Sequence, residues 1–359
     1  AYTPDQVDVR AFVDRLHPTR LKLQVADIIT ETVSTKTFRL KPVDRSLPPF
    51  QAGQYIGLYL EIGDIRTSRP YSISSSPCQT EFWDVTVRRV AEGLVSNYLL
   101  DEVAIGMEFE SSGPQGVFYF NPLYHMPNMV AIAGGSGITP FMSMIRDIVD
   151  RNIEREIFLL YGNQTNDDII FHEELEQLSN HYKRINYLPV VESPSEGYTG
   201  ATGYITSDLI MGVCGAVWDK TFFLCGPKGL YDFCLPELEG IGVNPNRVRR
   251  EMYGTPVHIW EYPGWPADIK GDDTFQIKVN TGATLEAQAG QSLLVTLENS
   301  GVVPPSVCRS GECSMCRMLV KSGKVFQPAG VAVRKSDRQH GYVHACVSYP
   351  LTDLEILLP

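Results

Sequence analysis

Four cysteines in the last part of the chain constrain its fold more than any other feature. Cys308, Cys313 and Cys316 lie in the segment CRSGECSMC with the spacing C-x4-C-x2-C, and 29 residues separate Cys316 from Cys346. In this arrangement four thiolates hold the two irons of a plant-type [2Fe-2S] cluster. Gly311 permits a tight loop in which backbone N-H groups point at the sulfurs, and the distant fourth thiolate closes the cage. The spacing therefore predicts a module built around a [2Fe-2S] centre.

Two other interpretations of these cysteines stay open, a structural zinc site and thiols that bind no metal. Zinc sites usually pair two C-x2-4-C knuckles, whereas Cys346 has no near cysteine partner and only His344 two residues away. In a large chain without a secretory signal, such clustering favours metal binding or catalysis over disulfides. The four remaining cysteines are scattered along the chain: Cys78, Cys214, Cys225 and Cys234.

Length and charge limit the class of protein. A chain of 359 residues exceeds what one hydrophobic core usually organises and predicts two or three domains. The formal net charge of -11 argues against nucleic-acid binding, which needs clustered Lys and Arg, and is more compatible with a protein partner. No apolar run approaches the roughly 18 residues of a membrane span, and the start AYTPDQVDVR does not resemble a signal peptide. We therefore expect a cytoplasmic protein.

The hydrophobic rhythm predicts a multi-domain fold of the α+β and α/β classes. After a polar extension over 1–20, short alternating runs over 21–122 predict an antiparallel β-barrel. Continuous apolar strands, glycine turns and amphipathic helices over 123–260 predict a parallel sheet covered on both faces. Residues 261–273 combine Pro, Gly and Asp as an interdomain linker does, and 274–359 form the cysteine module.

One predicted strand of the barrel carries a group of side chains suited to a flat, phosphorylated ligand. The run IRTSRPYSISSSP contains Arg69, Pro70, Tyr71 and Ser72. Residues two apart share a face of a strand, so Arg69 and Tyr71 point the same way. An arginine there can bind a phosphate bidentately, and the tyrosine can stack on a ring. Taken alone, the motif equally fits an edge strand with an exposed arginine.

Three further segments contain the glycine turns that phosphate groups require. A turn that opens a helix favours phosphate through its free N-H groups; it contains Gly93, Leu94, Val95 and Ser96. A second turn lies between an apolar strand and a helix; it contains Gly134, Gly135, Gly137, Ile138, Thr139 and Pro140. A third segment, C-G-P, contains Cys225, Gly226 and Pro227. The competing hypothesis, that Cys225 is a catalytic nucleophile, lacks a histidine in a recognisable partner motif.

Together these motifs resemble the ferredoxin-NADP reductase superfamily over residues 21–255, and the cysteine module resembles a plant-type ferredoxin domain, a β-grasp fold. The resemblance implies that Arg69 contacts flavin phosphate, Tyr71 packs on the isoalloxazine and Ser72 lies near N5, while the Gly93 turn cradles the pyrophosphate. The form G-x-V-S-N-Y-L is similar to FAD-binding members rather than FMN-binding ones. Thr139 would lie near flavin and nicotinamide, and Cys225 would line the nicotinamide pocket.

The resemblance also extends to the segment REMYG. There Glu251 and Tyr253 match a Glu and an aromatic residue that approach the flavin in this family, and ordinary strand packing is the alternative interpretation. No general acid or base is nominated. Ser314 departs from the glycine that plant-type ferredoxins commonly have, which would alter hydrogen bonding around the cluster without removing a ligand.

The choice of nucleotide depends on the segment NQTNDD. NADPH sites usually place Arg or Ser against the 2'-phosphate, whereas this chain has Asp167 and Asp168 there. Carboxylates would repel that phosphate, so we expect NADH rather than NADPH.

The order flavin, nucleotide, ferredoxin is similar to reductases of the phthalate dioxygenase reductase and phenylacetyl-CoA epoxidase reductase types. A hydride carries two electrons and the cluster accepts one, which explains a flavin between them. The resemblance implies an NADH-dependent reductase that passes electrons to a partner redox protein such as an oxygenase. Two alternatives stay open: a stand-alone iron-sulfur flavoprotein that reduces a small molecule or quinone, and a redox sensor.

Overall fold

The structure, a computed structural model, describes residues 13–14, 16–252 and 258–358. These residues form two compact units. The first contains the described chain up to Ile56 and from Tyr71 to Met252, and the second contains Gly57–Pro70 and the described chain from residue 258 onward. Most of the N-terminal extension, and Tyr253, lie outside the described residues. Within these ranges, no helix has the length and hydropathy needed to cross a membrane.

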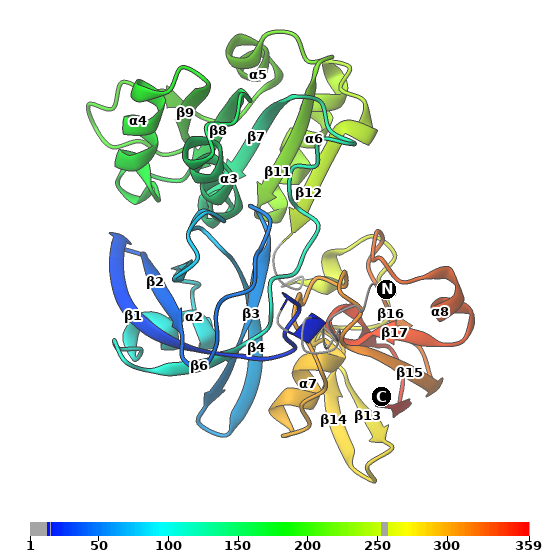
Figure 1. Ribbon diagram of the computed structural model, residues 1–359. Helices are drawn as coiled ribbons and strands as arrows, with labels where there is room; N and C mark the ends of the chain where they lie inside the picture. The colour runs from blue at the N-terminus through cyan, green and yellow to red at the C-terminus, as the bar shows by residue number, and fades with distance from the viewer. Residues whose placement is uncertain (1–12, 15, 253–257, 359) are drawn as a thin grey trace, which may run out of the picture. The chain divides into compact units, whose positions relative to one another are not determined.

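The predicted barrel is an antiparallel half-barrel. Its elements are β1 (Leu21–Thr32), β2 (Thr35–Pro42), β3 (Tyr55–Ile62), β4 (Ile65–Ser72), β5 (Trp83–Arg88), α2 (Leu94–Asp101) and β6 (Glu108–Ser111). The strands lie in the order β4-β3-β6-β1-β2-β5 (Figure 1). In β1, Leu21, Leu23 and Val25 are buried while Lys22 and Gln24 are exposed. This alternation produces a sheet with one apolar face, as the sequence predicts.

The second predicted module is a parallel sheet. Its elements are β7 (Asn128–Gly134), α3 (Thr139–Asp150), β8 (Ile157–Asn163), α4 (His172–His181), β9 (Ile185–Val191), β10 (Ala201–Thr202), α5 (Ser207–Cys214), β11 (Lys220–Gly226), α6 (Lys228–Gly240) and β12 (Val248–Met252). The strand order is β10-β9-β8-β7-β11-β12, and every neighbouring pair is parallel. This order places β7 at the centre, where the direction of winding reverses.

Both faces of this sheet are covered, which explains its continuous apolar strands. In β7, Ala131 packs in one cluster with Phe141 of α3 and Leu175 of α4. The next residue, Ile132, packs in a second cluster with Tyr231 of α6. Successive side chains of a strand point to opposite faces, so neighbouring residues of β7 enter different cores. Figure 1 shows the helices that lie along this sheet.

The cysteine module is a mixed sheet with one main helix, in agreement with the expected β-grasp fold. Its elements are β13 (Thr274–Val279), β14 (Thr284–Gln288), α7 (Leu293–Asn299), β15 (Arg317–Ser322), β16 (Val325–Phe326), α8 (Lys335–Gln339), β17 (Tyr342–His344), β18 (Tyr349–Pro350) and β19 (Leu354–Leu357). The main sheet has the order β14-β13-β19-β15-β17, with β13 and β19 parallel. Leu293 and Leu297 of α7 pack on Ile277 and Ile356 of the sheet.

The segment predicted as a linker contains more ordered packing than its composition indicates. Ile259, two residues before this segment, is fully buried in a cluster with Phe326 and Tyr349. Trp265 lies edge-on to Phe326 at 5.2 Å between ring centroids, and its Nε1 donates to the carbonyl O of Ile269 at 2.7 Å. Three aromatic rings thus hold this segment on the cysteine module. The exact domain boundaries stay a prediction.

Candidate functional site: a flavin strand, a nucleotide loop and a cysteine cage

The residues predicted to bind flavin are the last four residues of β4, from Arg69 to Ser72. Ser72 is buried, at 4% exposed, and Arg69 is half-buried. Arg69 Nη1 donates to Thr67 Oγ1 at 2.6 Å and to the carbonyl O of Ser68 at 2.8 Å. The guanidinium is therefore held along its own strand by two residues that sequence reasoning did not nominate. Alternation would have placed Thr67 on the same face as Arg69, which was the available signal.

The turn before α2 has the features of a phosphate cradle. Gly93 is its N-cap, and no side chain caps the helix. Ser96 Oγ instead accepts from the N-H of Val90 at 3.1 Å and donates to the carbonyl O of Gly93 at 3.3 Å. A Cβ at Gly93 would lie 2.6 Å from Ser96 Oγ, so the turn requires glycine. With Ser96 occupied in this way, no side chain of the helix competes with a phosphate for the first amides.

The two segments predicted to bind the nicotinamide nucleotide lie against each other. A Cβ at Gly137 would lie only 2.0 Å from the carbonyl O of Cys225, and one at Gly226 would lie 3.1 Å from the backbone of Gly134. Gly135 has a positive φ of 52°. Only glycines permit this approach, because any side chain would displace the neighbouring strand. The glycine loop leads into α3, a helix of 12 residues that begins at Thr139.

Cys225 and Glu251 lie side by side across two parallel strands. They are partners in the register of β11 and β12. Cys225 is fully buried and Glu251 is 5% exposed. The Tyr231 hydroxyl on α6 donates to the backbone carbonyl of Glu251, which fixes the end of β12. Thr139, 4% exposed, donates from Oγ1 to the carbonyl O of Ser136 at 3.0 Å. The predicted lining residues therefore occur at the carboxyl ends of adjacent strands, where open α/β sheets bind ligands.

Helix α3 is tied to the loop that follows the flavin strand. Ser143 Oγ donates to the carbonyl O of Ser75 at 2.7 Å, in a buried position. Arg146 donates to the carbonyl O of Ser74 at 2.8 Å and forms a bidentate ion pair with Glu174. These contacts set the nucleotide loop relative to the end of β4. Sequence reasoning missed them because a serine and an arginine within an amphipathic helix carry no local signal.

Asp168 is held by contacts within the protein that the sequence does not reveal. Its carboxylate pairs with Arg88 at the end of β5 and accepts hydrogen bonds from Thr32 and from Ser34 Oγ, the latter at 2.8 Å. The side chain is only 13% exposed. The Arg88 guanidinium therefore offsets part of the negative charge of this carboxylate, and its effect on a 2'-phosphate stays a prediction. Asp167 accepts a hydrogen bond from Asn166 and keeps an exposed position.

The four predicted cluster cysteines come together in a chain of neighbouring sulfurs. Hydrogen bonds from the thiols of Cys313 and Cys346 lower the pKa of Cys308, and the same contacts raise the pKa values of Cys313 and Cys346. A hydrogen bond from Cys346 lowers the pKa of Cys316. Each of the four thiols thus lies next to at least one other. Across the described residues, no three His, Cys, Asp or Glu side chains surround a single point as one bound metal ion would need.

The loop that carries three of these cysteines has an unusual backbone. Arg309, Gly311 and Ser314 all have positive φ, at 54°, 82° and 59°. This conformation turns the N-H of Cys313 toward Cys308 Sγ at 3.3 Å. An amide aimed at a sulfur is a donor that a thiolate ligand needs, so the loop fits an iron-sulfur cluster.

His344 supports the same loop. It is fully buried, and its Nδ1 lies 2.7 Å from the carbonyl O of Gly311, which places the proton on Nδ1. A Cβ at Gly311 would lie 2.8 Å from Val347 Cγ2, so the loop packs closely on the segment around the fourth cysteine.

Comparison with known proteins gives three family models in the predicted order. Residues 20–120 match the oxidoreductase FAD-binding domain, 131–235 the oxidoreductase NAD-binding domain, and 277–351 the 2Fe-2S iron-sulfur cluster binding domain. The chain is thus an oxidoreductase with sites for FAD, a nicotinamide nucleotide and a [2Fe-2S] cluster.

Relatives of similar length align with this chain over most of its residues. The glycine betaine monooxygenase reductase subunit of Pseudomonas aeruginosa is 28% identical, over 92% of this chain and 93% of its own. NADH oxidoreductase HCR of Escherichia coli K12 is 29% identical, over 93% and 96%. The fold of phthalate dioxygenase reductase matches with a TM-score of 0.68 at 22% identity, over 94% and 97%. The chain therefore contains an oxidoreductase FAD-binding domain, an oxidoreductase NAD-binding domain and a C-terminal 2Fe-2S iron-sulfur cluster binding domain, and its fold is similar to that of phthalate dioxygenase reductase.

Proposed function

We propose that this chain is the reductase component of a multi-protein system, which takes electrons from NADH and passes them singly to a separate redox protein such as an oxygenase. The observation that carries this proposal is the succession of FAD, NAD and 2Fe-2S modules in one chain. The similarity to a monooxygenase reductase subunit over 92% of the chain supports an oxygenase as the partner.

The residues divide into those that hold FAD, those that orient the nucleotide and those that hold the cluster. FAD, when bound, accepts a hydride and releases electrons one at a time. Arg69 and the turn from Gly93 to Ser96 would hold its phosphates, and Tyr71 and Ser72 would contact its ring. Thr139, Cys225 and Glu251 would line the place where the nicotinamide enters. The four thiolates would hold the two irons: Cys308, Cys313, Cys316 and Cys346.

The proposal of NADH as the electron donor rests on two observations. Asp167 is exposed after β8, where its carboxylate disfavours a 2'-phosphate. A relative that is 29% identical is named an NADH oxidoreductase. The ratio of kcat/KM values for NADH and NADPH tests this preference. We expect that Asp167→Ser raises kcat/KM for NADPH more than for NADH, and that Asp272→Ser, which removes an exposed carboxylate in the segment before β13, leaves the ratio unchanged. A wild-type preference for NADPH would contradict the proposal.

The stand-alone flavoprotein is the second candidate, and acceptor assays separate the two. We expect rapid NADH-dependent reduction of cytochrome c, which stands in for a protein acceptor, and slow turnover with quinones. Faster saturable turnover with a quinone than with any protein acceptor would favour the alternative.

A further inference from the structure

A buried ion pair lies directly beside the first cluster cysteine. Arg309 follows Cys308, and its guanidinium forms two hydrogen bonds of 2.8 Å with the carboxylate of Glu298 on α7. The arginine is 5% exposed and the glutamate 3%. Arg309 also has a left-handed backbone, with φ of 54°. A non-glycine residue rarely adopts this conformation, so the side chain is directed to its position at a cost in backbone energy.

The same pair contacts the flavin strand. Arg309 Nη1 donates to the carbonyl O of Ser68 at 3.2 Å and to Thr67 Oγ1 at 3.3 Å. Thr67 Oγ1 donates to Glu298 Oε2 at 3.2 Å, and Ser68 Oγ donates to the carbonyl O of Ser306 at 3.0 Å. These bonds fix strand β4 to Ser306 and Arg309, which lie on either side of Cys308 at the start of the cysteine loop.

Arg69 belongs to the same hydrogen-bond network. Its Nη1 donates to the same two acceptors on β4 that Arg309 uses, Thr67 Oγ1 and the carbonyl O of Ser68. One hydroxyl and one carbonyl therefore join the arginine proposed to hold flavin phosphate to the arginine next to Cys308. Two hydrogen bonds separate them.

The polar side chains of this network are almost completely buried. Thr67, Ser68 and Ser306 are 4%, 2% and 4% exposed. Burial of charged and polar groups costs free energy that their mutual bonds only offset, and apolar side chains of similar volume would pack as stably. Hydrogen bonds, however, fix register and distance where apolar contacts slide.

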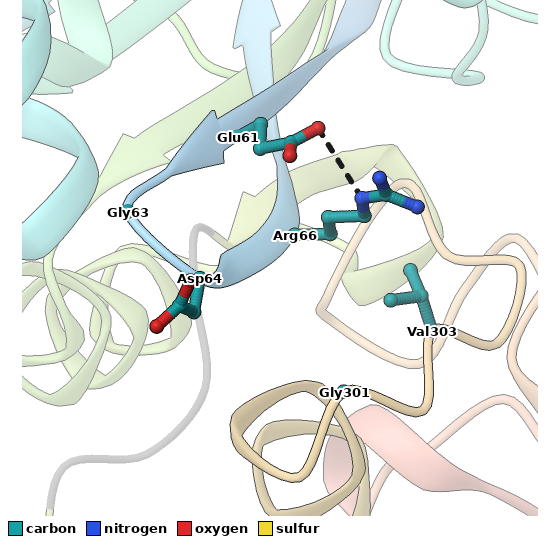
Figure 2. Close-up of a pocket in the computed structure, with 6 residues that line it drawn as sticks. All are labelled: Glu61, Gly63, Asp64, Arg66, Gly301 and Val303. Carbon is teal, nitrogen blue, oxygen red and sulfur yellow. Dashed lines mark hydrogen bonds and ion pairs between the residues drawn. The ribbon is translucent and has the colours of Figure 1, made fainter.

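The hairpin formed by β3 and β4 also lies near the loop that follows α7, at a second and more exposed place. Figure 2 shows its end and the loop after α7 facing each other across a pocket. The lining residues are Glu61, Gly63, Asp64, Arg66, Gly301 and Val303. Arg66 pairs with Glu61 within the hairpin at 3.2 Å, and no ion pair crosses this pocket among its lining residues. The β4 hairpin thus approaches the cysteine module at two places, and of these the buried network around Arg309 is the one with directional bonds.

We propose that Arg309 and Glu298, through Thr67 and Ser68, are positioning residues that hold the cluster loop in register with the flavin strand and so set the rate of electron transfer from flavin to cluster. This inference rests on the proposed function, because it concerns the step between two of its centres. A misplacement of about 1 Å between reacting groups is enough to slow a reaction about 100-fold.

The experiment follows cluster reduction in the purified holoprotein after rapid anaerobic mixing with NADH. Arg309→Met removes the charge and keeps the volume, and Thr67→Val removes the hydroxyl while leaving the ion pair in place. The matched control is Arg317→Met. Arg317 follows Cys316 as Arg309 follows Cys308, and it pairs with Asp337 at 3.1 Å, on α8 and away from β4.

We expect full iron and sulfide content and an unchanged cluster EPR spectrum in Thr67→Val, with cluster reduction slowed about tenfold or more relative to the flavin reduction that precedes it in the same variant. Arg309→Met should be slowed at least as much, and Arg317→Met should reduce its cluster at the wild-type rate. If Arg309→Met does not retain its cluster, Thr67→Val decides alone.

Two outcomes would overturn the inference: a wild-type rate of cluster reduction in Thr67→Val, or equal slowing in the Arg317→Met control. Failure of the proposed function is distinct, because the wild-type cluster itself would then not be reduced by NADH.

Discussion

At the scale of single residues, the backbone of the cysteine loop makes the first prediction. Ser314 has a φ of 59°, a conformation that glycine adopts without strain. We expect Ser314→Gly to stabilise the holoprotein by about 0.5–1 kcal/mol, since relief of left-handed strain exceeds the entropy that glycine adds to the unfolded chain. Chemical unfolding measures this change. Ser322→Gly within β15 is the control and should destabilise the protein. A similar loss of stability in both variants would show that Ser314 is not strained.

His125 gives the second prediction at this scale. Burial, with the charges of Arg249 and Arg155, lowers its pKa from the usual 6.5 to about 4. The folded state then binds fewer protons than the unfolded state between these values, so His125 should reduce stability as pH falls from 6.5 toward 4. His125→Phe keeps the edge-on contacts with Phe120 and Phe223 and removes the proton site.

The measurement is the free energy of unfolding at pH 6.5 and at pH 5. We expect a smaller loss over this interval in His125→Phe than in the wild type. Parallel slopes for the two proteins would show that His125 does not titrate as the structure implies.

At the scale of elements, the contact between the glycine loop and β11 is the testable feature. Gly137→Ala would place a methyl 2.0 Å from the carbonyl O of Cys225. We expect a loss of about 1–3 kcal/mol in stability together with a large rise in KM for NADH. Gly212→Ala is the control, because a Cβ there meets no atom within 4 Å; in α5 it should stabilise by about 0.5–1 kcal/mol and leave KM unchanged. An unaltered KM for NADH in Gly137→Ala would show that this loop does not contribute to the nucleotide site.

The same scale shows which elements the sequence could predict. The alternation in TKTFRLKP and the apolar run in NMVAIAG predict strands, and the structure has β2 and β7 over these residues. The short α5 and β10 were not predicted, because SDLIMGVC has a glycine within one brief helix and AT is a two-residue strand. Such elements are stabilised by their packing on the sheet, through Ile210 for example, rather than by a local pattern.

At the scale of the whole molecule, the order of the modules was readable from motifs, whereas the bonds that join them were not. The cysteine spacing and the paired glycine segments each report local chemistry. Thr67 and Arg309, however, lie 242 residues apart, and Arg88 and Asp168 lie 80 apart. Side chains this distant in sequence meet only after the sheets form, so the ion pair of Asp168 with Arg88 could not be read from the segment NQTNDD.

Under the proposed function, electrons pass from NADH through flavin to the cysteine-bound cluster. The most direct measurement is anaerobic stopped-flow absorbance of wild type and Cys313→Ser, with ferricyanide and cytochrome c as alternative acceptors. The account predicts that the wild type bleaches its flavin and then its cluster. Cys313→Ser should lose the cluster and cytochrome c reduction while it keeps NADH-to-ferricyanide activity. Loss of flavin reduction in Cys313→Ser, or full cytochrome c activity without a cluster, would contradict the account.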